Sequence, residues 1–493
     1  MPRTSFICTA TNLRYRKPVC KSLRHPNVSD TRYIVMRQGT ASHRRRKVAL
    51  VSLGCPKNTV DAEVLLGNLK DFEIVEKMEK ADAVIINTCG FIEDAKRESL
   101  GYIMQALDWK KKQRKGVVVT GCLAQRYANE LAEEIPQLDA VVGFANYANI
   151  ANTLHQILDE PTKSQVLVGE ATVPFQAEYF RHPLTPKHTS YLKIAEGCNH
   201  NCAFCSIPSF RGKFRSKPFQ SVLEEANMLV NRGVRELSLI AEDTNQYGMD
   251  FGNHDQRRLA DLLYELAEIP KLKWIRLLYC YPSYFSPALI RAIADIPKVV
   301  KYIDIPLQHA SDNVLKRMNR PSRSYTRQLL YQLKENIPGL CLRSTFICGF
   351  PGETEEDHRE LVEWIEEFAF ARAGFFTYSL EENTSAYHLD GHVSEQVKQA
   401  RKDELVSLQQ SIQESFATKW IGKKIEVMID KVEKGYSKGR AYFDAPEIDG
   451  VVYVLQQNLV PGNIYQIEIL GSHGWDLYGH VEDDKIAKET LQT

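Results

Sequence analysis

The middle of the chain holds three cysteines in one short run, Cys198-Asn-His-Asn-Cys202-Ala-Phe-Cys205. Thiolates separated by three and then two residues can bind three irons of an iron–sulfur cube from a single loop, which leaves the fourth iron open to a small ligand. Such a cluster can take part in a reaction as well as carry electrons. A zinc knuckle or a redox dithiol is the alternative, but zinc sites usually use two separated pairs of cysteines, and no second pair of this spacing exists in the sequence. We call these three residues the loop triad.

Three further cysteines, Cys55, Cys89 and Cys122, stand at equivalent places in the first part of the chain, between residues 47 and 155. Each ends a short apolar run, and helical patterns separate these runs, which indicates a parallel sheet with crossover helices. Ligands of open α/β sheets gather at the carboxyl ends of strands, so we expect the three thiols to converge on a second cluster. A single buried cysteine is often only a small apolar side chain, but three at one topological position favour ligation. These residues are the strand-end triad.

A second alternation of strands and helices runs from residue 189 to 419, after a linker at 156–188. Six apolar runs, the first beginning at Tyr191, alternate with amphipathic helical patterns. Six such units predict a partial (β/α) barrel, similar to a TIM barrel, with its chemistry at the carboxyl ends of the strands. The Cys198 loop follows the first strand, which is where such a barrel places its site.

The hydrophobic period changes to two from Ile421 onward, with Gly, Pro, Asn and Asp between the apolar runs. Residues 420–485 are therefore predicted to form a small antiparallel β-barrel. The whole chain is predicted to be an α/β protein. It begins with an open parallel sheet at 47–155, continues with the central partial barrel and ends with the small β-barrel.

The first 46 residues differ in composition from the rest. Through Lys47 the sequence holds twelve Lys or Arg and one acid, Asp30, with no apolar periodicity. We predict a disordered basic leader or an upstream start that is not used, and an organelle transit peptide is the alternative. Cys8 and Cys20, which lie in this leader, receive no role.

Composition limits the class of protein. The chain has 493 residues, of which 43% are hydrophobic, and a net charge of +1. The length favours several domains, and the charge argues against general electrostatic capture of nucleic acid. No apolar stretch is long enough to span a membrane. Eleven cysteines without a secretory signal fit a reducing compartment, so we expect a location in the cytoplasm, or in an organelle if the leader is a transit peptide. We also expect the chain to be a monomer.

Polar residues and glycines at the ends of the central strands could contact a small ligand. Glu242 and Asp243 end the second strand, and Gln308 lies at the end of the fourth. The fifth strand ends in residues 348–353 (CGFPGE), where glycines would let a ligand approach the backbone. Glu353 could accept a bond from an ammonium or a ribose hydroxyl. A helix cap or a turn is the alternative explanation for each of these positions.

Two further residues of the cysteine loop, Phe204 and His200, receive roles from their positions between the cysteines. Phe204 would shield a cluster and offer a flat face to an adenine. His200 is expected to be solvated and is not assigned as a ligand. The other cysteines of the central strands are expected only to pack in the core: Cys280, Cys341 and Cys348.

With these motifs the chain resembles a known family. The Cys198–Cys205 loop looks like the signature of radical S-adenosylmethionine (radical SAM) enzymes, and its combination with the strand-end triad and a small last barrel resembles the methylthiotransferases. Within that family the similarity is to the branch that modifies ribosomal protein S-twelve of the small subunit, and it covers residues 47 to about 481. Three stretches of this chain carry that similarity: 52–58 (SLGCPKN), 305–309 (IPLQH) and 444–449 (DAPEID). At the first cysteine, where this chain has Cys-Pro-Lys-Asn, the tRNA-modifying relatives tend to carry Cys-Gln-Met-Asn.

The resemblance implies two [4Fe–4S] clusters and S-adenosylmethionine as cofactors. The catalytic loop triad would bind the cluster whose open iron holds S-adenosylmethionine, and one electron would release a radical that takes a hydrogen from the β-carbon of an aspartate in the target protein. The strand-end triad would bind the second cluster, which presents the sulfur, and a second S-adenosylmethionine would donate the methyl group. The residues expected to contact S-adenosylmethionine are Phe204, Glu242, Asp243, Gln308, Arg343, Gly349, Gly352 and Glu353.

The resemblance also bears on partners. The last domain resembles the TRAM domain, which binds RNA in relatives. Residues 421–493 hold eight Lys or Arg and twelve Asp or Glu, whereas an RNA-binding module should be basic. We therefore expect the acidic barrel to bind a strongly basic partner, ribosomal protein S-twelve. Flavodoxin or ferredoxin is the expected reducing partner.

We interpret the chain as a radical SAM methylthiotransferase that inserts a methylthio group at the β-carbon of an aspartate in S-twelve. A tRNA methylthiotransferase that acts on a modified adenosine is the first alternative. An iron–sulfur electron carrier without a substrate is the second. That reading predicts neither a glycine-rich turn near the cluster nor a recognition domain, and the sequence has both.

Overall fold

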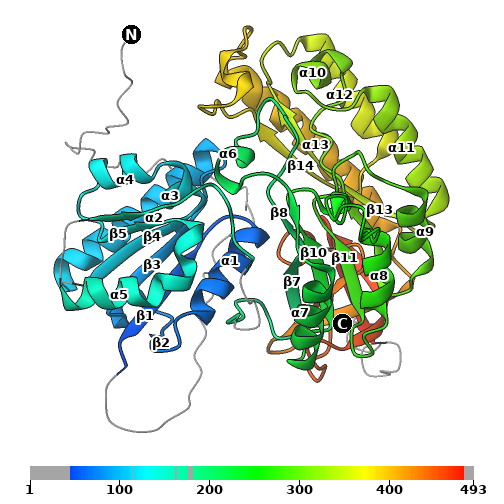
Figure 1. The fold of residues 1–493 in the computed structure, drawn as a ribbon. Helices are drawn as coiled ribbons and strands as arrows, with labels where there is room; N and C mark the ends of the chain where they lie inside the picture. Colours follow the sequence, from blue (N-terminus) through cyan, green and yellow to red (C-terminus); the bar gives the residue numbers. More distant parts are fainter. Residues whose placement is uncertain (1–44, 114, 161–163, 176–180, 482–493) are drawn as a thin grey trace.

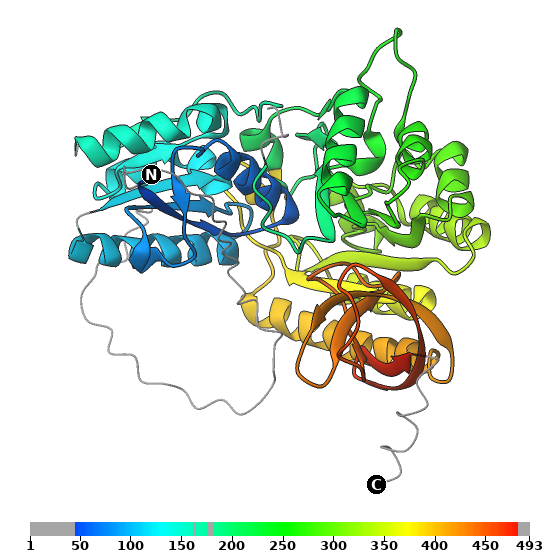
Figure 2. The same cartoon turned by 90° about the horizontal axis from the view of Figure 1, so that it is seen from below.

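A computed structural model describes residues 45–113, 115–160, 164–175 and 181–481 and shows three packed units (Figures 1 and 2). The N-terminal sheet with its helices is blue to cyan in Figure 1, and the central unit is green to yellow. The last barrel, orange to red, lies below the central unit in Figure 2. The leader predicted at 1–46 lies outside the described residues except at its very end, so it stays a prediction.

Short apolar runs form the strands of the N-terminal unit. The strands are β1 (Lys47–Ser52), β2 (Glu73–Ile74), β3 (Ala83–Thr88), β4 (Gly116–Gly121), β5 (Ala140–Val142) and β6 (Gln165–Leu167), and the helices are α1 (Pro56–Gly67), α2 (Glu93–Gln113), α3 (Cys122–Arg126), α4 (Ala128–Glu134) and α5 (Ile150–Asp159). The sheet is parallel, with the order β2-β1-β3-β4-β5-β6. Successive residues of β3, such as Val84 and Ile85, enter apolar clusters on opposite faces, which explains the continuous apolar runs.

The last strand of this sheet lies inside the stretch predicted as a linker. β6 pairs in parallel with β5, so the N-terminal unit extends beyond the predicted boundary at residue 155. The strand has three residues and none of them is buried. The sequence therefore has no apolar run that would mark it.

The central unit is the predicted partial barrel. Its strands are β7 (Thr189–Lys193), β10 (Glu236–Ile240), β11 (Trp274–Leu277), β12 (Val299–Asp304), β13 (Cys341–Cys348) and β14 (Arg372–Thr377), and its helices include α6 (Ile207–Arg211), α7 (Phe219–Asn231), α8 (Leu259–Ala267), α9 (Pro287–Asp295), α10 (Asp312–Arg317), α11 (Arg323–Asn336) and α12 (Glu355–Phe368). The parallel order β14-β13-β12-β11-β10-β7 leaves the sheet open, and a small ribbon of β8 (Ala195–Glu196) and β9 (Arg215–Ser216) lies beside it. The fold class predicted from the sequence is confirmed.

A long helix, α13 (Glu395–Thr418), leads from the central unit to the last barrel. The barrel is closed in the order β15-β16-β17-β19-β18, formed by β15 (Lys424–Val432), β16 (Ser437–Ala441), β17 (Val452–Val454), β18 (Ile464–His473) and β19 (Asp476–Val481). Four neighbouring pairs are antiparallel as predicted, but β17 and β19 pair in parallel because the chain crosses β18 before it returns. Within the described ranges, no helix is both long and apolar enough to cross a bilayer.

The last barrel packs against the inner face of the central sheet. Trp274 and Tyr302 from the sheet share one apolar cluster with Val427 from the barrel. Glu236 joins the two units as well, because it accepts bonds from Arg276 at 2.9 Å and from Arg440 at 2.7 Å. The cysteines predicted only to pack are buried in these cores: Cys280, Cys341 and Cys348.

Candidate active site

The loop triad lies between β8 and α6, at the carboxyl end of the central sheet. Gly197, with a φ of +73°, begins the loop. A Cβ there would stand 2.2 Å from a backbone carbonyl oxygen, so this turn requires glycine. The amide of Cys198 donates to the carbonyl of Gly212 at 3.1 Å, and the amide of Cys205 donates to the carbonyl of residue 202 at 3.0 Å. These bonds hold the three thiols on one short turn.

His200 supports this loop from within the protein. Its Nε2 lies 2.7 Å from Oδ2 of Asp243, and its ring stacks on Tyr281 with 3.6 Å between the ring centres. Burial raises the pKa of the Asp243 carboxyl, and the bond from His200 opposes that rise. The expectation that His200 is solvated is therefore wrong. Its partners come from the ends of other strands, which the sequence around His200 does not reveal.

Arg320 approaches the loop triad from the segment after α10. Its guanidinium lies 4.1 Å from the centre of the Tyr281 ring, and its Nη1 donates to the Cys202 sulfur at 3.6 Å. A histidine ring and a guanidinium this close to one ring centre must lie on opposite faces of the tyrosine. Sequence reasoning had singled out neither Tyr281 nor Arg320.

The strand-end triad gathers at the carboxyl ends of three neighbouring strands. Cys55 precedes the first helical residue of α1, Cys89 follows β3, and Cys122 begins α3 directly after β4. A Cβ on Gly54 would stand 2.8 Å from the Cβ of Cys89, and one on Gly121 would stand 2.4 Å from a side-chain oxygen. Both glycines have φ close to +90°. Glycine at these two positions lets the three loops approach one another.

Burial sets the chemistry of these thiols. It raises the pKa of Cys89 to about 12, and the charges of Cys122 and Cys55 add to the rise. Burial also raises the pKa of Cys198 and Cys205 to about 12. Thiols in such places become thiolates when a bound metal supplies positive charge.

Both donor sets fit iron–sulfur clusters. In the described parts of the chain, no group of three His, Cys, Asp or Glu side chains is arranged to hold one metal ion. The ligands of a cluster bind separate irons, so they stand further apart than ligands that share a single ion. Each triad supplies three thiols and leaves a fourth iron without a cysteine, which matches a cluster with one open position.

One side chain, Arg211, connects the two triads. It ends α6, the helix directly after the loop triad, and its Nη2 donates to the Cys122 sulfur at 3.4 Å and to Asp61 at 2.7 Å. Burial opposes its charge, but Cys122 and the nearby carboxylates outweigh burial and raise the pKa of Arg211 well above its usual value. The two triads therefore face the same junction between the N-terminal sheet and the central sheet.

Glu242 is the predicted cofactor contact that the structure supports best. Its side chain is 1% exposed, and the Nε of Arg211 lies 3.7 Å away. Neither carboxylate oxygen has a hydrogen-bond partner. A buried carboxylate without bonds is costly unless a ligand supplies the donors. The ammonium and hydroxyl groups of S-adenosylmethionine are donors of the required kind.

The glycine-rich turn after β13 is braced by the protein itself. Glu353, which was expected to accept a bond from a ligand, accepts bonds from the Gly349 amide at 2.6 Å and from Arg401 at 2.9 Å. A Cβ on Gly349 would stand 2.2 Å from the side chain of Lys398, and one on Gly352 would stand 2.6 Å from an arginine of α10. Protein side chains thus fill the space beside both glycines where the prediction places a ligand.

The remaining predicted contacts have mixed surroundings. Phe204 is half-buried and packs on the apolar cluster that includes Phe350. Gln308, with a φ of +75°, uses its backbone to bridge to β13. Arg343 donates to Asp304 at 2.7 Å and lies 3.7 Å from Asp449 of the last barrel. Because its charge is already paired at that junction, the structure does not favour Arg343 as a cofactor contact.

Two acidic residues of the last barrel, Asp444 and Asp449, are engaged inside the molecule. Asp449 accepts a bond from the Tyr302 hydroxyl at 2.7 Å, and Asp444 pairs with Arg372. Part of the acidic excess falls at 482–493, outside the described residues. The expectation of an acidic docking face is therefore not met by the described surface. Its exposed charged residues are Lys423, Lys424, Lys431, Lys434, Glu426 and Glu447.

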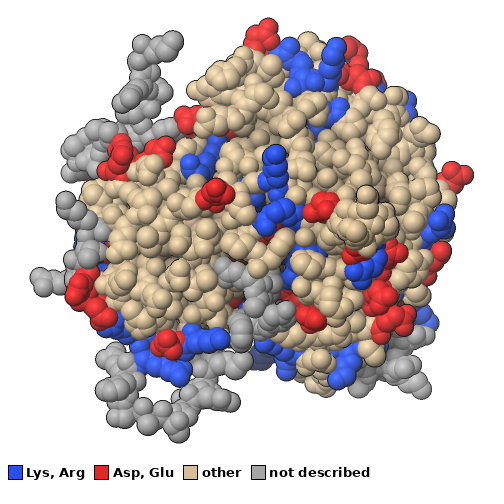
Figure 3. All heavy atoms as spheres, in the orientation of Figure 1, with Lys and Arg blue, Asp and Glu red and all other residues tan. Residues whose placement is uncertain are grey.

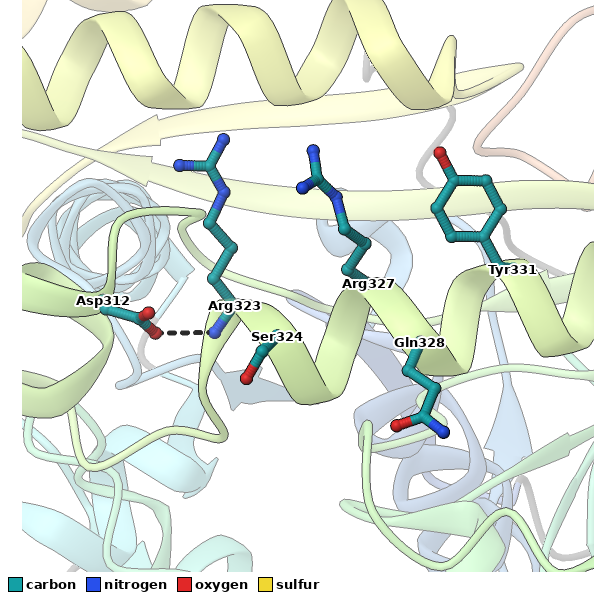
Figure 4. Close-up of a pocket in the computed structure, with 6 residues that line it drawn as sticks. All are labelled: Asp312, Arg323, Ser324, Arg327, Gln328 and Tyr331. Carbon is teal, nitrogen blue, oxygen red and sulfur yellow. Dashed lines mark hydrogen bonds between the residues drawn. The ribbon is translucent and has the colours of Figure 1, made fainter.

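Two features of the outer surface lie apart from this site. Figure 3 shows basic and acidic side chains interspersed on one face, in line with the net charge of +1. Figure 4 shows a hollow on the outer helix α11, lined by Asp312, Arg323, Ser324, Arg327, Gln328 and Tyr331. Its two arginines pair with Glu360 and Glu367, so their charges are balanced without a ligand. The hollow contains no member of either triad.

Comparisons with known proteins agree with this arrangement. Residues 47–143 match the Uncharacterized protein family UPF0004, residues 192–365 match the Radical SAM superfamily, and residues 421–481 match the TRAM domain. A solved structure, the radical S-adenosylmethionine methyltransferase TsrM from Kitasatospora setae, aligns with a TM-score of 0.49 at 15% identity over 67% of this chain and 73% of its own. That likeness is too weak to carry an argument.

Curated relatives are much more similar. The ribosomal protein uS12 methylthiotransferase RimO of Desulforamulus reducens is 44% identical over 88% of this chain and 99% of its own length. The protein of the same name from Caldanaerobacter subterraneus subsp. tengcongensis is 45% identical over 88% of this chain and 99% of its own. At this identity and coverage, the chain belongs to the RimO family of radical S-adenosylmethionine methylthiotransferases.

Proposed function

We propose that the protein attaches a methylthio group to the β-carbon of an aspartate in ribosomal protein uS12. The observation that carries this proposal is the placement of both triads at one junction, with Arg211 following the first and contacting the second. One such centre could supply the radical that breaks an unactivated C–H bond, and the other could supply the sulfur. The names of the relatives at 44–45% identity support the target.

We infer that each triad holds a [4Fe–4S] cluster and that S-adenosylmethionine binds beside the loop triad. When bound, these groups supply the radical that removes a hydrogen from the β-carbon, the sulfur that replaces it and the methyl group that caps the sulfur. The β-carbon thus loses one C–H bond and gains one C–S bond. The electrons come from a reducing partner, for which flavodoxin or ferredoxin is the proposed class.

The residues of this chain bind, orient and exclude water. His200, Asp243 and Arg320 hold the thiols of the loop triad in place. Glu242 is placed to accept bonds from the ammonium or hydroxyl groups of S-adenosylmethionine. An aliphatic C–H bond has no acidic proton, so side-chain acids and bases would not help, and positioning in a dry site is what the protein can contribute.

A tRNA target is the alternative, and the relatives do not favour it because their names specify uS12. The TRAM domain match and the lysines exposed on the last barrel are the observations on its side. For this reason tRNA is assayed as a substrate beside uS12.

The test uses the full chain, reconstituted anaerobically with iron and sulfide. The protein is incubated with S-adenosylmethionine and a reductant, and either uS12 or total tRNA from the same organism is added. The proposal predicts a gain of about 46 Da, the mass of CH₂S, on one aspartate of uS12. An unchanged uS12 together with a methylthio group on tRNA would contradict it.

We also propose that the enzyme acts as a monomer in the cytoplasm, the organellar location being the alternative if the leader is a transit peptide. The relatives named above are bacterial, which supports the first location. Light scattering of the purified chain tests the oligomeric state. Imaging of a C-terminally tagged chain, with and without residues 1–46, tests the location.

A further inference from the structure

Lys57 is a buried lysine without a negative partner. It lies in the first turn of α1, two residues after Cys55, and is 6% exposed. Its Nζ donates to the carbonyl of Ala241 at 3.3 Å and stands 3.5 Å from the centre of the Tyr279 ring. Among the described residues, no carboxylate lies within ion-pair distance of this ammonium.

The other buried lysines show that this is an exception. Four of them are covered to a similar degree, and each pairs with a carboxylate: Lys96 with Glu381, Lys193 with Asp61, Lys217 with Glu225 and Lys398 with Glu395. A lysine is seldom buried unless it is paired, because removing an ammonium from water is costly. A carbonyl and an aromatic face compensate only part of that cost. The Lys57 ammonium therefore lacks an anion.

The position of Lys57 places the missing anion between the two triads. Tyr279, under the ammonium, has a φ of +60°, a strained value for a tyrosine of the kind that gathers at functional sites. Its ring lies under the ammonium of a residue that follows Cys55 by only two positions, so it faces the start of α1 beside the strand-end triad. Two residues further along, the Tyr281 ring stacks on His200, which lies inside the loop of the loop triad. The segment after β11 thus contacts residues next to both triads, Lys57 near Cys55 and His200 inside the loop triad.

We propose that Lys57 binds the side-chain carboxylate of the target aspartate and so places its β-carbon between the two triads. This inference rests on the proposed function. The carboxylate carbon is bonded directly to the β-carbon, so a fixed carboxylate confines the reacting carbon to within one bond length. A buried ammonium also discriminates, because an asparagine amide or a neutral base offers no negative charge to pair with it.

The test is a double-mutant cycle, in which one change is made in the enzyme and one in uS12. The affinity of the reconstituted enzyme for uS12 is measured under anaerobic conditions. The enzyme is wild type or Lys57→Met, and the ligand is uS12 or uS12 with the target aspartate replaced by asparagine. Wild type should bind the aspartate form at least about tenfold more tightly, and Lys57→Met should bring this ratio close to one. Lys57→Arg should keep most of the preference because it keeps the charge. Lys96→Met is the matched control, since Lys96 is equally buried but already paired, and it should leave the ratio unchanged.

Several outcomes would overturn the inference. A wild-type enzyme that binds both forms of uS12 equally refutes it, whether or not Lys57→Met folds. An equal loss of affinity for both forms in Lys57→Met also refutes it. If Lys57→Met lacks the irons of the strand-end triad, the anion that Lys57 pairs with is the cluster and not the substrate. In each case the methylthio group on uS12, measured with the wild-type enzyme, shows whether the proposed function still stands; a wild-type enzyme that does not modify uS12 refutes both.

Discussion

The two triads of this protein are built in opposite ways. The loop triad comes from one run of chain, and its shape depends on near neighbours, such as the bond from the Cys198 amide to the Gly212 carbonyl. The strand-end triad exists only when β1, β3 and β4 pair in register, because each of its members follows a different one of these strands. One site is a property of a loop, and the other is a property of a folded sheet.

This difference determines how a substitution near one triad should affect cluster assembly at the other. A local change near one triad should leave the other able to assemble, because they share no cysteine. Arg211 is the exception, since it ends the helix after the loop triad and contacts Cys122 of the strand-end triad. We therefore expect two separable sites, with Arg211 as a side chain whose loss affects both.

The largest expected effect comes from removing one cysteine of each triad. Cys198→Ala should lower cleavage of S-adenosylmethionine, measured as 5′-deoxyadenosine, to the level of a protein-free blank, because two thiols do not hold the cluster. Cys89→Ala should leave this cleavage within about twofold of wild type and abolish the methylthio product. If both variants cleave the cofactor equally poorly, the triads do not divide the reaction between them.

The next effect tests the coupling. Arg211→Met leaves Glu242 without its nearby cation and removes the donor to Cys122, so we expect a loss of about 3–5 kcal/mol in the free energy of unfolding. Urea titration gives this value, and iron analysis should show a loss at the strand-end triad. Arg211→Lys is the control that keeps the charge, and it should lose less. An Arg211→Met protein with wild-type stability and full iron content would show that the triads are independent.

A smaller effect tests whether the strand-end triad depends on the close approach of the loops after its strands. Gly54→Ala forces a side chain against Cys89 at a φ of +90°, and should cost about 1–3 kcal/mol and lower the iron content of the strand-end triad only. Gly101→Ala, inside α2, meets nothing within 4 Å and should stabilise the protein by about 0.5–1 kcal/mol. Thermal unfolding and iron analysis of both variants check this. A Gly54→Ala protein that behaves like Gly101→Ala would contradict the close approach of the three loops.

The smallest effect concerns a junction that carries no cysteine triad. Burial favours a raised pKa for Asp430, but Arg440 and His188 outweigh it and bring the pKa to about 2. Since this value lies below the usual 3.8, the ionised group stabilises the folded state by about 2 kcal/mol above pH ~4, and this is lost as the pH falls toward 2. Asp430→Asn should remove that part of the dependence of stability on pH. Measurements of the free energy of unfolding between pH ~2 and ~5 check this.

The control for this prediction is an exposed pair. Hydrogen bonds from Arg257 also lower the pKa of Asp255 to about 2, but the Arg257 side chain is half exposed, whereas the Arg440 and His188 side chains that face Asp430 are buried. Asp255→Asn should leave the acid dependence nearly unchanged, since exposed ion pairs contribute little. If both variants behave alike, the last barrel is not held to the central sheet by Asp430.

The two triads also show what the sequence can and cannot predict. The loop triad follows from spacing alone, and the strand-end triad follows from the alternation of strands and helices, because both patterns lie along the chain. Lys57, Arg211 and Arg320 were not predicted as site residues. Their contacts come from residues about 90 to 180 positions away, which no local pattern marks.

Charged residues were the hardest to assign to ligands or partners from the sequence. Glu353, Arg343 and the acidic residues of the last barrel were expected to face ligands or partners, but most have partners inside the protein. A sequence lists charges without showing which of them neutralise each other. Glu242 is the contrasting case, because its carboxylate was predicted to meet a ligand and both of its oxygens lack hydrogen-bond partners.

The most direct test of the central claim is an iron count on the full chain after anaerobic reconstitution, combined with Mössbauer spectroscopy and an assay on the same sample. The account predicts about eight irons per polypeptide in two cubane clusters, and about four in a protein whose strand-end triad is replaced by alanine. A preparation that methylthiolates uS12 while holding no more than about four irons would contradict it.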